Sequence, residues 1–254
     1  PDGSAYFKVP AKLPIYFIAL DAQGRAVQRM RSHTQLMPGE VQGCIGCHEQ
    51  RHETLLTGRF PEVLGRQPDV LRSPEWGARG FDYASIVQPV LDQHCVKCHN
   101  PRGEETGTGV VSRPPIPLDL TGDRTDFFNM SYEVLARKDQ GRTGSPYVNW
   151  IPTYNGHEWN ILEITPKKWG SHASKLTEII LSGHPDADGK PRVALDDPAR
   201  RRIFAWIDLN VPYYGTADTA HPELPACRQM LPKDLRAAMD TVFARRCTDC
   251  HERP

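Results

Sequence analysis

The hydrophobic positions of this chain form short runs and stripes separated by long polar stretches. An apolar run of strand-forming residues covers 15–20, turn-forming residues follow at 21–24, and a mixed pattern resumes at 26–30. This order predicts a β-hairpin near the start of the sequence. No run reaches the roughly 18 apolar residues of a membrane-spanning helix, so the sequence predicts no membrane span.

Helical spacing of apolar residues appears twice in the middle of the chain. Residues 83–94 carry such a stripe and predict a short helix, which Pro89 limits or bends. Residues 171–182 carry a second stripe, and Gly183 fits the position that follows a helix end.

Two more helices are predicted further on. Asp197 fits an N-cap with Pro198 in the first helical position, and the aromatic segment 212–215 ends this helix. Pro232 begins the last predicted helix, whose apolar stripe leads directly to Cys247.

The chain is rich in residues that interrupt helices and strands. It contains 20 Gly and 23 Pro in 254 residues, and only 39% of its residues are hydrophobic. That share is below the usual globular value, so side chains alone supply little apolar core. We therefore expect a mainly α fold with much irregular loop, plus the short N-terminal β-hairpin.

Three copies of the pattern Cys-X-X-Cys-His carry the chemistry. In each copy two thiols can add to the vinyl groups of one haem as thioethers, and the histidine that follows can bind the iron. The sequence thus predicts three covalently bound c-type haems in multihaem cytochrome c modules. The predicted attachment residues and proximal ligands are Cys44, Cys47 and His48; Cys95, Cys98 and His99; and Cys247, Cys250 and His251.

Zinc binding and thiol redox chemistry are the alternatives to haem. Paired Cys-X-X-Cys motifs also build zinc sites, but those sites need no histidine directly after the second cysteine. A thioredoxin-like motif does not occur in triplicate with such a histidine. With only 10 His in the chain, three trailing histidines favour haem strongly over both alternatives.

The motifs suggest three units and a cellular location. We expect a hairpin and first haem module at 1–75, a second haem module at 76–215, and a helix with the third motif at 216–254. Because haem is attached covalently outside the cytoplasm, we expect a periplasmic or extracellular protein and a processed or excised mature segment. The 31 basic and 31 acidic residues balance, which gives no electrostatic case for binding nucleic acid or an anionic membrane.

Further histidines are candidate distal ligands. His184 follows the predicted helix end at Gly183 and precedes a proline, so we rank it first. His52 lies four residues after His48, where it could bind another metal, replace His48 or remain solvated. His221 precedes the third module and is the third candidate. Cys227 is left over, either as a small buried residue or as a ligand or intermolecular partner.

Several sequence segments outside the motifs resemble those of one protein family. They are the segments 14–17, 29–32 and 38–40 before the first motif, then 171–176, 183–184 and 206–215. Together they resemble the haem-binding region of the hydrazine synthase alpha subunit and its relatives. The resemblance implies a catalytic first haem and a second haem that relays electrons. It also implies that this second haem has two histidine ligands, here His99 and His184.

One residue departs from the family pattern at the first motif. The family has a tyrosine four residues after the motif histidine, near the iron, and this chain has His52 at that place. The family's upstream β-propeller is also missing from this sequence. Both differences favour a strongly ligated first haem that transfers electrons.

Two functions follow from these observations. The first is a tri-haem electron carrier between redox partner proteins outside the cytoplasm. Copies of the chain could also be its partners, in a head-to-tail filament. The second is a haem enzyme that acts on a small nitrogen compound or peroxide at an open first haem. Glu49, Arg51 and His52 could then serve as acid–base groups.

Overall fold

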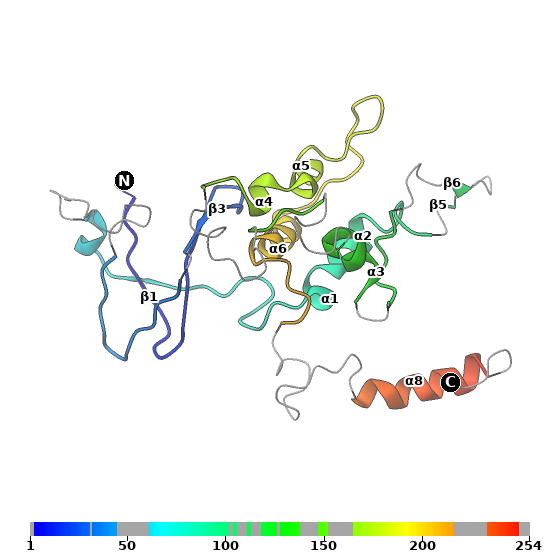
Figure 1. The fold of residues 1–254 in the computed structure, drawn as a ribbon, viewed down its shortest axis with the longest axis horizontal. Coiled ribbons are helices and arrows are strands. Elements are labelled where there is room, and N and C mark those ends of the chain that lie inside the picture. Colours follow the sequence, from blue (N-terminus) through cyan, green and yellow to red (C-terminus); the bar gives the residue numbers. More distant parts are fainter. Residues whose placement is uncertain are drawn as a thin grey trace, which may run out of the picture.

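The computed structural model of this chain describes residues 3–30, 32–44, 61–101, 104–105, 111–112, 118–125, 128–137, 147–151, 165–215 and 233–248. Short helices gather at the centre of the molecule, and the N-terminal strands lie to one side of them (Figure 1). The described helices are η1 (Glu62–Gly65), α1 (Tyr83–Ile86), α2 (Gln88–His94), α3 (Met130–Tyr132), η2 (Glu133–Arg137), α4 (Gly170–Ala173), α5 (Lys175–Leu181), α6 (Asp197–Asp208) and α8 (Lys233–Arg246). The described strands form three two-stranded pairs: β1 (Phe7–Lys8) with β4 (Asp69–Val70), β2 (Ile18–Leu20) with β3 (Ala26–Arg29), and β5 (Glu104–Glu105) with β6 (Val111–Ser112).

The predicted hairpin is confirmed as the antiparallel pair of β2 and β3. Asp21 builds its turn, because one carboxylate oxygen accepts hydrogen bonds from the backbone N–H groups of Gln23 and Arg25. The Arg25 side chain also pairs with this carboxylate at 2.8 Å. The first strand covers only the end of the apolar run, and the register of the pair shifts between Ala19 and Leu20.

The predicted stripe at 83–94 forms two helices. The Asp82 carboxylate caps α1 by accepting a hydrogen bond from Ala84 N–H, and α1 ends at Ile86. Pro89 lies in the first turn of α2, where its missing N–H costs no helical hydrogen bond. The prediction that this proline limits the helix is confirmed.

The prediction of one helix over 171–182 is wrong at its centre. Ser174 has an extended backbone with φ −82° and ψ 127°, so it separates α4 from α5. Its hydroxyl caps α5 by accepting a hydrogen bond from Thr177 N–H and donates to the Tyr147 carbonyl. A serine that caps a new helix competes with continuation of the preceding one.

The predicted ends of α6 are displaced along the chain. Asp196, not Asp197, is the N-cap, and its carboxylate accepts a hydrogen bond from Ala199 N–H at 2.8 Å. The helix ends before the 212–215 segment, because Asn210 and Val211 have positive φ angles of 68° and 47°. Val211 N–H then bonds to the Trp206 carbonyl at 2.9 Å, which closes the helix end.

Aromatic side chains from α1, α3, α6 and the segment after α6 form the main core. The Tyr83 ring is fully buried and lies 5.1 Å from the Tyr132 ring and 5.0 Å from the Trp206 ring, centre to centre. The Tyr83 hydroxyl donates to Ser131 Oγ at 2.9 Å, so its polar end is paired inside the core.

A buried carboxylate joins the N-terminal hairpin to this core. Asp208 is 2% exposed at the end of α6. It accepts hydrogen bonds from Ala26 N–H of β3 at 3.0 Å and from Ser171 N–H of α4 at 2.7 Å. The Ser171 hydroxyl adds a third bond at 2.8 Å. One side chain thus ties together three elements that are distant in sequence.

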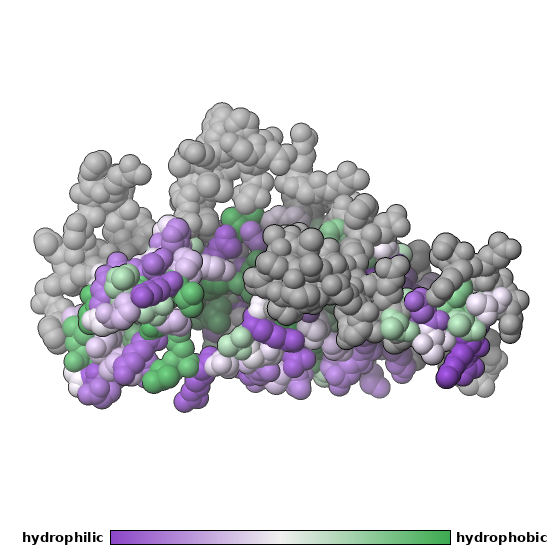
Figure 2. All heavy atoms as spheres, turned by 90° about the horizontal axis from the view of Figure 1, so that it is seen from below, coloured by the Kyte–Doolittle hydropathy of each residue, from purple (hydrophilic) through white to green (hydrophobic). Residues whose placement is uncertain are grey.

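The outer parts of the described chain are more exposed. Large apolar side chains of the N-terminal segment reach solvent, with Val41 81% exposed and Leu20 58% exposed, and apolar and polar residues intermix there at the left of Figure 2. Helix α8 forms as predicted and lies apart from the central helices in Figure 1. Within the described residues, no helix has the length and apolar character needed to span a bilayer.

Candidate functional site

The second Cys-X-X-Cys-His motif continues directly from α2. Cys95 caps this helix, and its N–H bonds to the Leu91 carbonyl at 2.8 Å. The chain then turns so that the N–H groups of Cys98 and His99 both reach the Cys95 carbonyl, at 3.1 and 3.0 Å. Both cysteines and the histidine therefore lie on one tight turn at the edge of the core.

His184 is held at the far end of α5. Gly183 has φ 74°, and its N–H bonds to the Ile180 carbonyl at 3.1 Å. His184 N–H reaches the Ile179 carbonyl at 2.9 Å. These two bonds are the Schellman arrangement, which confirms Gly183 as the residue after the helix end.

The fold brings His99 and His184 together although 85 positions separate them. Their ring centres lie 6.0 Å apart, and the ring planes differ by only 14°. An imidazole nitrogen binds a metal at about 2 Å, so two imidazoles on one metal have ring centres roughly 6 Å apart. The separation of the His99 and His184 ring centres matches this value.

The surroundings keep both imidazoles neutral. Burial lowers the pKa of His99, and the nearby His184 and Arg192 lower it further. Burial and Arg192 likewise lower the pKa of His184. A neutral imidazole offers a lone pair to a metal, whereas a protonated one does not.

His99 Nδ1 is buried and has no partner with full hydrogen-bond geometry. The Leu118 carbonyl lies close enough to this ring to raise its pKa slightly against the other effects.

One of the two motif cysteines, Cys95, is partly buried against the core. Burial, together with Cys98, raises the pKa of the Cys95 thiol to about 11. Reactive and metal-bound cysteines need the thiolate, which such a pKa disfavours. Within the described residues, no three His, Cys, Asp or Glu side chains cluster closely enough to hold a metal ion.

The other two motifs are only partly described. Cys44 is exposed after the N-terminal segment, and Cys247 follows α8 as a half-buried residue. The remaining predicted site residues lie outside the described residues: Cys47, His48, His52, Cys250, His251, His221 and Cys227. Their assignments stay predictions.

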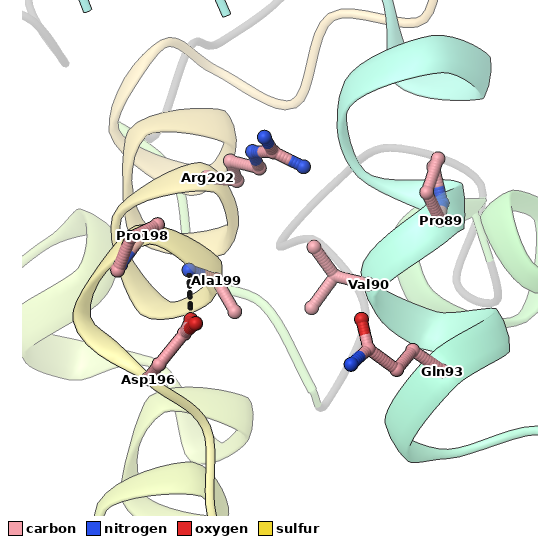
Figure 3. A pocket seen from close by; sticks show the side chains of 7 residues that line it. All are labelled: Pro89, Val90, Gln93, Asp196, Pro198, Ala199 and Arg202. Carbon is pink, nitrogen blue, oxygen red and sulfur yellow. Dashed lines mark hydrogen bonds between the residues drawn. The ribbon is translucent and has the colours of Figure 1, made fainter. Parts of the chain in front are cut away.

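A shallow pocket lies between α2 and α6 (Figure 3). Its volume is about 140 Å³, and Val90, Gln93 and Arg202 line it with four neighbours. The Asp196 carboxylate at its edge is already engaged in capping α6, as the dashed line in Figure 3 marks. Pockets that hold cofactors or drug-sized ligands measure about 300 Å³ or more, so this pocket is too small for that role.

Sequence reasoning missed two residues of the site. Leu118 approaches His99 from the segment after β6, and Arg192 approaches His184 from the loop before α6. Neither stands in a motif, and both reach the site only because loops fold back over it. No local pattern in the sequence could have identified them.

Comparisons with known proteins concern mainly the first motif. A family model described as the hydrazine synthase alpha subunit middle domain matches residues 1–49. This segment includes the first Cys-X-X-Cys-His motif as far as His48. For these residues the resemblance to the hydrazine synthase alpha subunit is confirmed.

A solved structure, the hydrazine synthase of Kuenenia stuttgartiensis, is 18% identical to this chain with a TM-score of 0.45. The match covers 79% of this chain and 30% of that chain, so this chain spans less than a third of that protein's length. No curated protein matches the sequence.

Proposed function

We propose that this chain is a tri-haem c-type cytochrome in which His99 and His184 bind the second haem iron from opposite sides. One observation carries the proposal: two neutral imidazoles from distant segments lie 6.0 Å apart and nearly parallel beside the Cys95–Cys98 turn. Such ligation leaves no open position for a substrate. The proposed role of this haem is therefore electron transfer.

The residues around this pair have defined parts in the proposal. Cys95 and Cys98 each add a thiol across a vinyl group, so that a carbon–sulfur bond forms and the proton moves to the neighbouring vinyl carbon. Val96 packs on the main core and keeps the motif turn fixed against α2. A haem bound in this way supplies one-electron chemistry without a change in iron coordination.

The first haem has a second candidate function. The family match covers the first motif and belongs to a family named for a synthase, which favours catalysis over simple electron storage there. We propose that an open first haem acts on a small nitrogen compound or peroxide and exchanges electrons with the second haem. His52, if it binds this iron, would close the site and leave a pure electron carrier.

The spin states of the ferric irons separate these two functions. Electron paramagnetic resonance of the purified protein should show low-spin signals from the haems that carry two strong ligands. Three low-spin signals would support the electron carrier. A high-spin signal that cyanide or nitric oxide changes would support the enzyme.

His184→Ala tests the ligand pair itself. We expect this variant to gain one high-spin signal and to bind carbon monoxide at one additional haem when reduced. Glu178→Ala is a control on α5, the helix that precedes His184. If His184→Ala retained the wild-type spectrum, the proposed ligation would be wrong.

The proposal includes partners and location. Since c-type haems are attached outside the cytoplasm, we place the protein in the periplasm or outside the cell, with redox proteins as its partners. Head-to-tail assembly of copies is tested by sedimentation at rising concentration. A single monomeric species at every concentration would contradict such assembly.

A further inference from the structure

The segment after α5 forms a closed loop around His184. The Gly183 carbonyl accepts hydrogen bonds from Arg192 N–H at 2.9 Å and Val193 N–H at 3.1 Å. Pro185 and Pro191 pair as an isolated antiparallel bridge inside this closure. Residues 183–193 thus leave the helix and return to it within eleven positions.

The tip of this loop is held by its own turn. Asp186 Oδ1 accepts hydrogen bonds from Asp188 N–H at 3.0 Å and Lys190 N–H at 2.8 Å. The Asp186 carboxylate is therefore used in shaping the loop.

His184 has an unusual backbone conformation in this loop. Its φ angle is 49°, in the left-handed region that non-glycine residues seldom adopt. Such a conformation persists where the surrounding contacts enforce it, and it is common at ligand-binding residues. Something in the loop must therefore hold the backbone of residues 184 and 185.

The Arg192 side chain makes the contacts that do so. Its Nε–H donates to the His184 carbonyl and its Nη2–H donates to the Pro185 carbonyl, both at 3.1 Å. A guanidinium can reach two neighbouring carbonyls at once because its donors form a rigid, planar fork. A lysine ammonium would keep the charge but would lack this geometry.

Resting on the function proposed above, we infer that Arg192 is the positioning residue that holds His184 as the sixth ligand of the second haem. The Arg192 guanidinium also places its charge beside His184, with Nε 3.1 Å from the His184 carbonyl oxygen. A fixed positive charge at this distance favours the reduced form of a bound iron. Arg192 thus has two separable effects, one from its geometry and one from its charge.

Three variants of the holoprotein test this inference. Arg192→Gln removes both the positive charge and the planar set of guanidinium donors. Arg192→Lys keeps the charge and removes only that donor geometry. Arg66→Gln is the matched control, because it removes an exposed arginine that pairs with Asp69 elsewhere in the chain.

Two readouts separate geometry from charge. We expect carbon monoxide to displace His184 from the reduced second haem about tenfold faster in both Arg192 variants, from the loss of roughly one charge-assisted hydrogen bond. We expect the reduction potential of this haem to fall in Arg192→Gln and to stay near the wild-type value in Arg192→Lys. The Arg66→Gln control should match the wild type in both readouts.

The outcomes distinguish the inference about Arg192 from the proposed ligand pair on which it rests. If His184→Ala alters the second haem but both Arg192 variants behave like the wild type, the inference is wrong and the ligand pair stands. If His184→Ala changes nothing, the ligand pair is wrong as well.

Discussion

At the scale of single residues, Asp208 and the backbone next to it set the tightest constraint in the structure. Gly170 has φ 59°, and a Cβ built on it would lie 2.3 Å from Asp208 Oδ1. The carboxylate cannot move away easily, because it accepts three hydrogen bonds from Ala26 and Ser171. A side chain at position 170 would therefore disturb the contact between hairpin and core.

Gly170→Ala should destabilise the protein by about 3 kcal/mol, from backbone strain together with the close contact to Asp208. Gly189→Ala is the matched control, since Gly189 has φ 81° but nothing within 4 Å of an added Cβ. We expect the control to cost about 1 kcal/mol, from backbone strain alone. Urea denaturation measures both free energies of unfolding. Equal losses in the two variants would contradict the proposed role of Asp208.

Asp208 should also give stability a specific pH dependence. Burial raises its pKa above the ordinary value of 3.8, although hydrogen bonds from Ser171 and Ala26 oppose this effect. A carboxyl whose folded pKa is raised contributes most below the unfolded pKa and loses that contribution as pH rises through the folded pKa.

The amide in Asp208→Asn cannot titrate, so this variant isolates the effect of the raised Asp208 pKa on stability. The wild type should gain free energy of unfolding relative to Asp208→Asn as pH falls from about 7 to about 4. Denaturation series at several pH values measure this difference. A difference that stays constant, or shrinks at low pH, would show that the three hydrogen bonds outweigh burial and that the pKa is not raised.

At the scale of elements, capping side chains decide where these short helices begin and end. Ser174 separates α4 from α5 and bonds to both Thr177 and Tyr147. It is 4% exposed, so water cannot easily replace these bonds.

Ser174→Ala should cost about 1–2 kcal/mol of stability, because it removes an N-cap and leaves the Tyr147 carbonyl with one partner fewer. Ser182→Ala is the control at the other end of α5, where the exposed hydroxyl bonds only to the Ile179 carbonyl. We expect this control to cost less than about 0.5 kcal/mol. Thermal unfolding compares the two variants, and a larger loss in Ser182→Ala would overturn this assignment of the caps.

The elements also show what the sequence could and could not predict. The hairpin, the break at Pro89 and the role of Gly183 follow from local chemistry, and the structure has all three. The break at Ser174 and the shifted N-cap at Asp196 were missed, because serine and aspartate fit several positions and tertiary contacts choose among them. Helices α3 and η2 were missed because residues 119–138 show no regular apolar spacing.

The candidate site likewise contains residues that the sequence could predict and residues that it could not. His184 could be predicted because its signal is local, a glycine before it and a proline after it. Its pairing with His99 depends on how α5 packs beside the motif turn, and the residue-based argument alone could not choose His99 as its partner. Arg192 depends on the closure of residues 183–193, which only the folded chain reveals.

At the scale of the whole molecule, one main cluster of buried side chains forms the core of the described residues. It centres on α1, α2, α3 and α6, while the N-terminal segment leaves apolar residues such as Leu13 and Val41 exposed. Three haems would add apolar surface that side chains do not supply. The second haem would also join the motif turn at Cys95 to the loop at His184, where the His99 and His184 ring centres lie 6.0 Å apart.

Replacing both cysteines of the second motif tests this view of the molecule. We expect the double variant Cys95→Ala/Cys98→Ala to lose one of three haems, as measured by intact mass and by the pyridine haemochrome spectrum. The loop around His184 should then lose its tether, so hydrogen exchange should rise at residues 183–193 and at the motif turn but not in α1. The matched control is Cys227→Ala, which we expect to retain all three haems because Cys227 belongs to no motif. Unchanged haem content in the double variant would refute attachment at the second motif, and faster exchange confined to the motif turn would refute the link to His184.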